Sequence, residues 1–154
     1  MDREIEYRDV LATDADVLAG HRFDGAVDCD AERVAYSSWV TGRISSGTYL
    51  GRVALVDSAV VAGAGVVLLD GGPTRGNVGG ILARVVSVYT RPALRRRGVA
   101  SELVRQVMDK AASLGVRDFR LAASAEGAGL YRALGFRSYD AEMILKLPPA
   151  TAVR

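Results

Sequence analysis

The sequence has very little cysteine and histidine. Among its 154 residues there is one cysteine, Cys29, and one histidine, His21. A single cysteine excludes an internal disulfide and argues against a zinc site built from cysteines, so we expect no metal and a reduced, cytoplasmic setting. A lone histidine on a helix is more often a packed or surface residue than a catalytic one, and we interpret His21 in that way.

Long apolar runs and a strong excess of one charge are also missing. No run approaches the ~18 residues of a membrane span, and residues 1–6 are too acidic for a signal peptide. The net charge is only +2, and no aromatic residues interrupt the arginines between Arg91 and Arg97, so neither a membrane nor a nucleic-acid partner is expected. Hydrophobic residues make up 49% of the chain and can form one core. We expect a single domain over residues 1–148 and a C-terminal tail over 149–154.

The most informative stretch is an apolar strand followed by a helix. Ile81 to Thr90 is rich in β-branched residues and apolar on both faces, as in a strand buried in the middle of a sheet, and Pro92 ends it. The helix follows because apolar residues recur at helical spacing and Gly115 stands at its end. Its expected buried face consists of Ala100, Leu103, Val104, Val107, Ala111 and Leu114.

The start of this helix has no capping residue. Neither Ser, Thr, Asp nor Asn directly precedes Gly98, so the first N–H groups need another partner. Three arginines, Arg95 to Arg97, stand beside the positive end of the helix dipole, which is unfavourable unless an anion binds there. Gly98 would allow the anion to approach the backbone.

These residues resemble a known family. Arg95-Arg96-Arg97-Gly98-Val99-Ala100 matches the (Gln/Arg)-x-x-Gly-x-(Gly/Ala) signature of the GCN5-related N-acetyltransferase (GNAT) superfamily, between a strand and a helix as in that family. Downstream, Leu130-Tyr131-Arg132-Ala133-Leu134-Gly135-Phe136 is similar to the family's second cofactor-side segment. The two matched segments together identify the chain as a member.

The remaining elements follow from periodicity and turn signals. We expect strands over residues 4–10, 49–56, 59–69, 118–123, 136–139 and 142–147, and helices over 13–23, 31–45 and 127–134. Asp57-Ser58 predicts a tight hairpin turn, and residues 70–80 a mobile loop. In the 31–45 helix, Val34, Trp39 and Ile44 are candidates for burial. The predicted fold class is α/β, the GNAT-type acyltransferase fold, with a mixed sheet of six or seven strands and helices on both faces.

The resemblance implies acetyl-coenzyme A (acetyl-CoA) as cosubstrate. Its pyrophosphate would bind the helix start and its pantetheine arm would pair with the end of the central strand, which must separate from its neighbour there, as a β-bulge would allow. The expected cofactor-binding residues are Val88, Tyr89, Thr90, Arg95, Arg96, Arg97, Gly98, Val99, Ala100, Ser101 and Ser124. Ser124 replaces an asparagine found in many relatives.

The implied reaction is direct attack of an amine on the thioester. It needs a donor to the oxyanion, for which an N–H near Val88 or Tyr89 is available, and a proton for the thiolate. Tyr131 matches the family tyrosine that supplies this proton. No Asp or Glu lies between Ile81 and Thr90, so the general base stays open among the residues Ser87, Ser124, Glu126 and Glu32 and water.

Two functions of different class remain open. One is an N-acetyltransferase acting on a primary amine of a small molecule or protein, which Tyr131 favours. The other is a domain that binds acetyl-CoA without turnover, as a sensor or structural module, which the missing base favours. The acceptor, the length of the acyl group and a homodimeric state are also open. Tyr36, Trp39 and Glu32 are acceptor-side candidates by resemblance, although core packing and a solvated carboxylate explain them at least as well.

Overall fold

A computed structural model describes residues 3–150 of the chain. By its internal contacts the chain divides into two compact units, residues 1–122 and 123–154. The boundaries of a single domain over 1–148 therefore stay a prediction, and residues 151–154 of the expected tail lie outside the described part.

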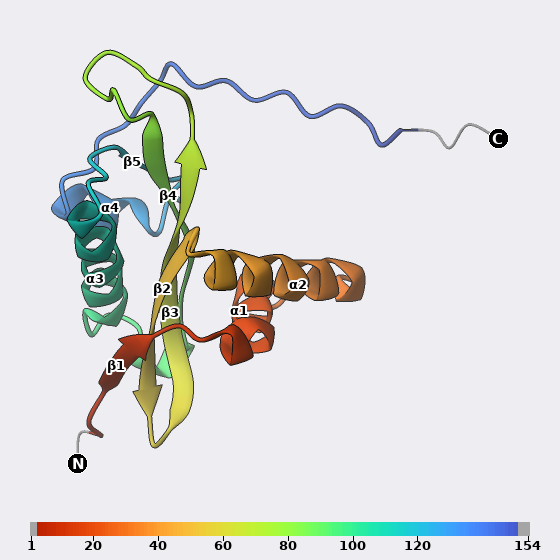
Figure 1. Cartoon of the computed structure of the whole chain (residues 1–154). Coiled ribbons are helices and arrows are strands. Elements are labelled where there is room, and N and C mark those ends of the chain that lie inside the picture. Colours follow the sequence, from red (N-terminus) through yellow and green to blue (C-terminus); the bar gives the residue numbers. More distant parts are fainter. Residues whose placement is uncertain (1–2, 151–154) are drawn as a thin grey trace. The chain divides into compact units, whose positions relative to one another are not determined.

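The first unit is a five-stranded mixed sheet with helices on both faces (Figure 1). The strands lie in the order β1-β2-β3-β4-β5, antiparallel except for the parallel pair β4–β5. Their bounds are β1 Glu6–Asp9, β2 Tyr49–Val56, β3 Ala59–Asp70, β4 Ile81–Thr90 and β5 Phe119–Arg120. The helices are α1 Ala15–Arg22, α2 Asp30–Ser46 and α3 Val99–Ser113, with single 3-10 turns at η1 Ala12–Asp14 and η2 Pro92–Leu94.

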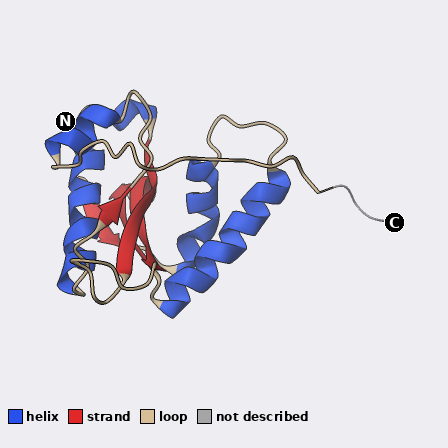
Figure 2. Ribbon diagram, turned by 90° about the horizontal axis from the view of Figure 1, so that it is seen from above, coloured by secondary structure: helices blue, strands red, loops and turns tan. Residues whose placement is uncertain are grey.

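Helix α3 covers one face of the sheet, and α1 and α2 lie on the other (Figure 2). The apolar face predicted for α3 is buried at Leu103, Val104, Val107 and Ala111, whereas Leu114 lies beyond the helix and is exposed. On the opposite face the core consists of Val10, Ala15, Leu18, Val40, Tyr49, Val53, Leu55 and Val67. The central strand is thus positioned between two packed layers.

Helix α2 buries a different face from the one predicted. Val34 is 71% exposed and Trp39 is 37% exposed, so only Ile44 of the three candidates packs against the core. The buried line is Tyr36, Val40 and Ile44, whose spacing of four residues places them on one side of the helix. Val40 is the one fully buried residue of this helix.

The hairpin between β2 and β3 has the predicted two-residue turn. Asp57 and Ser58 both have positive φ, 49° and 66°, as the favoured hairpin turns require. The following loop, residues 71–80, is closed by the pair Thr74–Asn77, which exchange backbone hydrogen bonds of 3.0 Å.

The predicted end of the sheet is wrong in three places. β5 spans Phe119–Arg120 instead of residues 118–123, and its side chains are half-buried. Residues 136–139 and 142–147 form no strand within the described chain, so the sheet has five strands instead of six or seven. Alternating apolar residues form a strand only where a neighbouring strand pairs with them and their side chains pack. Here the apolar side chains of this segment are exposed, namely Met143, Ile144, Leu145 and Leu147.

The second unit contains one helix among its described residues, α4 Ala128–Ala133. Its last turn ends at Gly135, whose φ of 100° and N–H bond to the Arg132 carbonyl form the helix stop. The Phe136 and Tyr131 rings then pack edge to face, with ring centroids 5.9 Å apart. This returns the chain over its own helix.

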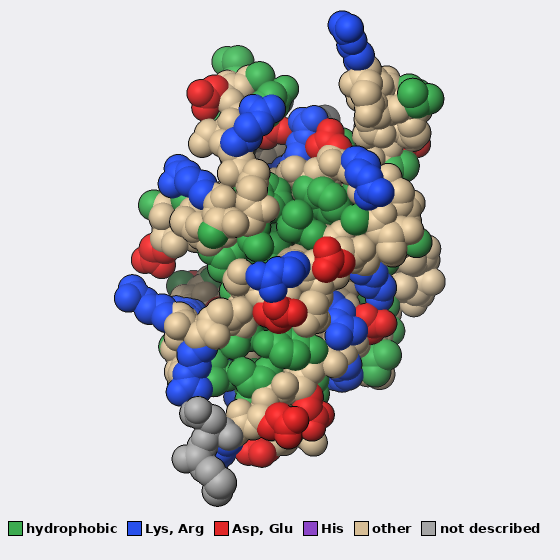
Figure 3. Space-filling view, turned by 90° about the vertical axis from the view of Figure 1, so that its left-hand side faces the viewer, with side chains coloured by type: hydrophobic (Ala, Val, Ile, Leu, Met, Phe, Trp, Pro, Cys, Tyr) green, Lys and Arg blue, Asp and Glu red, His purple; other side chains and the backbone are tan. Residues whose placement is uncertain are grey.

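No helix within residues 3–150 is long and apolar enough to span a membrane. Positive and negative side chains are interspersed on the face shown in Figure 3, in keeping with the small net charge.

Candidate acyl-transfer site

A β-bulge interrupts β4 in the middle of the site. Gly63 pairs with Tyr89 and Gly65 pairs with Val86, so two residues, Ser87 and Val88, stand opposite Ala64 alone. Ser87 has a φ of 56°, which a side chain adopts at a cost of about 1–2 kcal/mol. The bulge that the pantetheine hypothesis required is therefore present.

The edge of β4 that faces β5 is free along the same stretch. β5 pairs with β4 only at Ala83 and Arg84, and within residues 3–150 no other strand continues that ladder toward Thr90. This leaves the predicted pantetheine-binding residues, Val88, Tyr89 and Thr90, on an unpaired strand edge. The Thr90 carbonyl already accepts a 2.9 Å hydrogen bond from Arg95 Nε.

The start of α3 carries no side-chain cap, as predicted. Gly98 is the N-cap residue with a φ of 78°, and Arg96 has a φ of 62°. Alternating left- and right-handed residues turn successive N–H groups toward one side, which forms an anion-binding nest. A Cβ placed on Gly98 would meet no atom within 4 Å, so the nest is open to a ligand.

The three arginines differ in their roles. Arg95 lies over the Tyr89 ring, with its guanidinium carbon 5.9 Å from the ring centroid, and is held by Thr90. Arg96 and Arg97 are exposed and form no ion pair with any residue in the described part of the chain. Two uncompensated positive charges thus stand beside the nest.

Three hydroxyl groups lie close together at the bulge, on the face of the sheet that α1 and α2 cover. The Ser87 hydroxyl is buried and hydrogen-bonded to the hydroxyl of Tyr36 from α2. The Tyr49 hydroxyl is buried beside both. Burial, and secondarily the nearby Tyr36, raise the pKa of Tyr49 well above its ordinary value of 10. The buried Tyr49 phenol therefore keeps its proton at neutral pH. We refer to Tyr36, Tyr49 and Ser87 as the hydroxyl cluster.

Two glycines make room for the Tyr49 ring. A Cβ on Gly65 would lie 2.2 Å from the Tyr49 hydroxyl oxygen, and a Cβ on Gly51 would lie 2.7 Å from the ring carbon Cε1. The glycines of β2 and β3 therefore serve the packing of an aromatic ring over the sheet.

His21 lies on the same face of the bulge. Its ring stacks on the Tyr89 ring with centroids 4.3 Å apart and planes 24° apart. Sequence reasoning treated His21 as an ordinary packed residue and did not single out Tyr49. The glycines at 51 and 65 were a possible signal for Tyr49, whereas the contact between His21 and Tyr89 depends on the path of α1 and has no local signal.

In the second unit, Ser124 and Tyr131 belong to the same turn and helix. The Ser124 hydroxyl accepts a 3.2 Å hydrogen bond from the Gly127 N–H and so serves as a local turn contact. Tyr131 is half-buried, and this burial raises the pKa of its phenol. Their cofactor and catalytic roles stay predictions.

β4, with its bulge and its free edge toward β5, thus leads along the chain to the uncapped start of α3. The chain belongs to the acetyltransferase (GNAT) family, which matches residues 19–136. The resemblance seen in the sequence is thereby confirmed.

Solved structures show the same fold. A predicted acetyltransferase from Clostridium acetobutylicum, solved with acetyl-CoA, is 21% identical with a TM-score of 0.84, covering 93% of this chain and 96% of its own. A GCN5-related N-acetyltransferase from Ralstonia eutropha JMP134 is 23% identical with a TM-score of 0.84, covering 94% and 99%. Glucosamine-6-phosphate N-acetyltransferase from Arabidopsis thaliana is 16% identical with a TM-score of 0.73, covering 94% and 99%. No curated protein sequence matches the chain significantly.

Proposed function

We propose that this chain transfers the acetyl group of acetyl-CoA to a primary amine by direct attack within a ternary complex. The observation that carries the proposal is the bulge at Ser87 beside the free edge of β4, followed directly by the uncapped start of α3. The family and the fold support it, and the Clostridium relative was solved with the same cosubstrate.

The cosubstrate would bind along β4 and α3. The N–H groups around Gly98 and the exposed Arg96 and Arg97 suit a pyrophosphate, because a helix start offers both N–H donors and a positive dipole. The free backbone edge of β4 at Val88 and Tyr89 would pair with the amide groups of pantetheine, which would extend the sheet as an added strand does. The thioester would then lie at the bulge.

The chain's own groups account for two steps of the reaction. A backbone N–H of Val88 or Tyr89 would donate to the oxyanion that forms on the attacked carbonyl. Tyr131 keeps its proton at neutral pH because burial raises its pKa, and its phenol would donate that proton to the leaving thiolate. The acceptor, an amine of a small molecule or protein, would approach from the side of α1 and α2.

One observation favours a second function, binding of acetyl-CoA without turnover. β4 carries no carboxylate, and the predicted bases Glu32 and Glu126 are both exposed. A sensor or structural module would need no base.

Thiol release distinguishes the two functions. Purified protein is mixed with acetyl-CoA and a panel of aliphatic, amino-acid and amino-sugar amines, and free thiol is measured together with calorimetric binding of acetyl-CoA. Amine-dependent thiol release supports the transferase. Tight binding with no thiol released by any amine contradicts it and supports the sensor.

A further inference from the structure

The C-terminal end of α1 lies over the register pair Gly63–Tyr89, next to the bulge of β4. Leu18, one turn before His21, lies on Gly63, since a Cβ at Gly63 would be 3.7 Å from Leu18 Cδ2. Gly63 is the register partner of Tyr89, the residue on which His21 stacks. Two independent contacts therefore place His21 beside Tyr89, which lies two residues after Ser87 on β4. This is the side of α1 and α2, from which the acceptor is proposed to approach.

The two ring nitrogens of His21 differ in their surroundings. Nδ1 is buried and has no hydrogen-bond partner among the described residues, whereas Nε2 is not enclosed in this way and the residue is only partly buried. A proton accepted from a ligand therefore arrives at Nε2.

The charges around His21 keep the imidazole neutral. Burial is the main cause that lowers its pKa below the ordinary 6.5, and the positive charge of Arg91 lowers it further, while Asp24 acts in the opposite direction. Tyr89 is stacked on the ring, Arg95 lies over Tyr89, and the hydroxyl cluster lies on the same face. At pH 7 the imidazole thus has a free lone pair.

Other groups near the bulge are poor proton acceptors. In the hydroxyl cluster, Tyr36 and Ser87 are hydrogen-bonded to each other, and the Tyr49 phenol keeps its proton because burial raises its pKa. Asp14, the buried carboxylate of the α1 segment, is already bound by two nitrogens of Arg8 at 2.7 and 2.9 Å. The neutral imidazole, which stacks directly on Tyr89 of β4, is therefore the suitable base among these groups.

We propose that His21 is the general base of the acetyl transfer, accepting at Nε2 a proton from the ammonium group of the acceptor. The proposal rests on the proposed transferase function. Loss of this proton converts R–NH₃⁺ to R–NH₂, whose lone pair forms the C–N bond to the thioester carbonyl carbon. The C–S bond breaks with its electron pair going to sulfur, the thiolate takes up one proton, and the nitrogen loses a second, so one proton is released overall.

The test compares His21→Phe with wild type, using the panel amine that releases thiol fastest. Phenylalanine keeps a ring on Tyr89 but has no nitrogen. We expect kcat/KM at pH 7 to fall roughly 10²–10⁴-fold, as loss of a general base typically does, with acetyl-CoA affinity within about twofold of wild type. Imidazole added to His21→Ala should restore part of the rate. A His21→Phe protein with wild-type kcat/KM overturns the assignment.

The pH profile gives a second readout that does not depend on the folding of a variant. Because His21 is the only histidine, its Cε1–H resonance reports its pKa without ambiguity. In the pH profile of wild-type kcat/KM, the apparent pKa of the acidic limb must equal the pKa of His21 measured by this resonance, which lies below 6.5. Arg91→Gln removes a positive charge and should raise both the pKa of His21 and the apparent pKa of the limb. Asp24→Asn removes a negative charge and should lower both. A limb that does not follow the resonance overturns the assignment.

Failure of the transferase proposal and failure of the His21 assignment give different experimental results. A wild-type protein that binds acetyl-CoA but releases no thiol with any amine contradicts the transferase and with it a base at His21. Amine-dependent release that is unaffected by His21→Phe contradicts His21 alone.

Discussion

Tyr131 is the residue on which the leaving-group half of the proposed reaction depends. Its ring is fixed against Phe136, so removal of the hydroxyl in Tyr131→Phe keeps the packing. We expect single-turnover acetylation from preloaded acetyl-CoA to slow by roughly 10²–10⁴-fold, because the thiolate loses its proton donor. Acetyl-CoA affinity should stay within about twofold. Single-turnover measurement is needed because product release can hide the step at steady state.

Tyr139→Phe is the matched control, since it removes a hydroxyl from an exposed tyrosine of the same unit. It should acetylate at the wild-type rate. If Tyr131→Phe also does so, Tyr131 is not the acid, and the thiolate leaves without help or takes its proton from water.

Residue roles were predictable from the sequence only where a local motif defines them. The uncapped start at Gly98 was readable because capping depends on a few adjacent residues. The pairing of Ser87 with Tyr36 joins residues 51 positions apart, and the stack of His21 on Tyr89 joins two separate elements. Such contacts depend on how α1 and α2 pack on the sheet, which residue spacing does not determine.

At the scale of elements, the nest at the start of α3 makes a direct prediction. Gly98→Glu adds bulk and a negative charge where the pyrophosphate is proposed to bind. We expect the acetyl-CoA dissociation constant, measured by calorimetry, to rise by roughly tenfold or more, since tenfold corresponds to only about 1.4 kcal/mol.

Gly115→Glu is the control for this variant. Gly115 lies just beyond the other end of α3 and also has a positive φ, 95°, so the substitution brings the same charge and a comparable backbone strain. Its acetyl-CoA affinity should match that of wild type. Equal affinities of folded Gly98→Glu and wild type would refute the nest as the phosphate site.

Among the elements, those with their own periodicity and end signals were predicted correctly. β4 has the predicted bounds, and the β2–β3 hairpin has the predicted turn at Asp57 and Ser58. A bulge toward the end of β4 was suggested by the resemblance, and its place at Ser87 could not be read from residue types, because the register belongs to two strands. The strands expected after Phe136 failed for a related reason, since no ladder partner is specified by their alternation.

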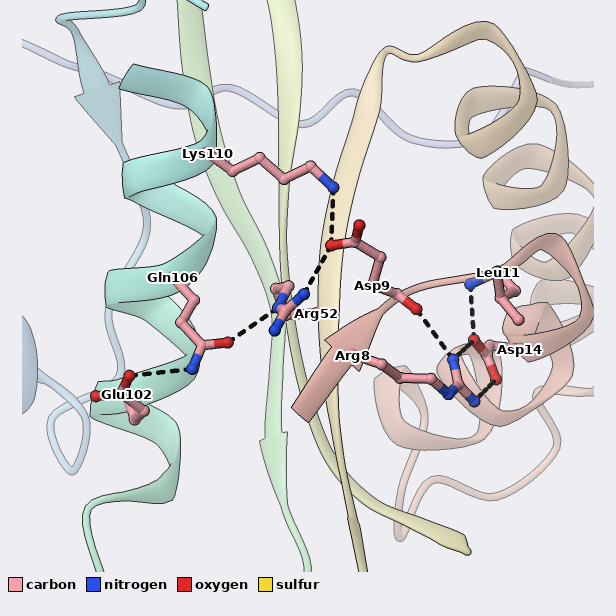
Figure 4. Close-up of polar contacts among 8 residues, drawn as sticks. All are labelled: Arg8, Asp9, Leu11, Asp14, Arg52, Glu102, Gln106 and Lys110. Atoms are coloured by element: carbon pink, nitrogen blue, oxygen red, sulfur yellow. Dashed lines mark hydrogen bonds and ion pairs between the residues drawn. The ribbon is translucent and has the colours of Figure 1, made fainter. Parts of the chain in front are cut away.

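At the scale of the molecule, a charged network joins the first strand to the rest of the first unit (Figure 4). The Asp9 carboxylate binds Lys110 of α3 at 2.8 Å and Arg52 of β2 at 2.9 Å, and Arg52 also donates to Gln106. These groups are partly exposed, so each contributes little to stability.

The buried part of this region is different. Asp14 is 8% exposed and accepts hydrogen bonds from Arg8 and from the backbone N–H of Leu11 at 2.8 Å. The bond from Arg8 is the main cause that lowers the pKa of Asp14 below its ordinary value. A carboxylate whose pKa is lower in the folded state stabilises the fold above the unfolded pKa of about 3.9, and this contribution disappears as the pH falls through the folded pKa.

Asp14→Asn should therefore destabilise the first unit in a pH-dependent way. Asparagine keeps the shape but loses the charge-assisted bonds, so we expect the free energy of unfolding at pH 7 to fall by about 1.5–3 kcal/mol. The difference should shrink as the pH falls from about 4 through the lowered folded-state pKa, where the wild-type carboxylate becomes protonated as well. Urea unfolding followed by the fluorescence of Trp39, the only tryptophan, measures the free energy of unfolding at pH 7 and pH 3.

Asp57→Asn, which breaks the exposed pair of Asp57 with Arg3, is the control and should change stability by no more than about 0.5 kcal/mol. An Asp14→Asn effect that is absent at pH 7, or equally large at pH 3, would show that the charge of Asp14 does not stabilise the fold.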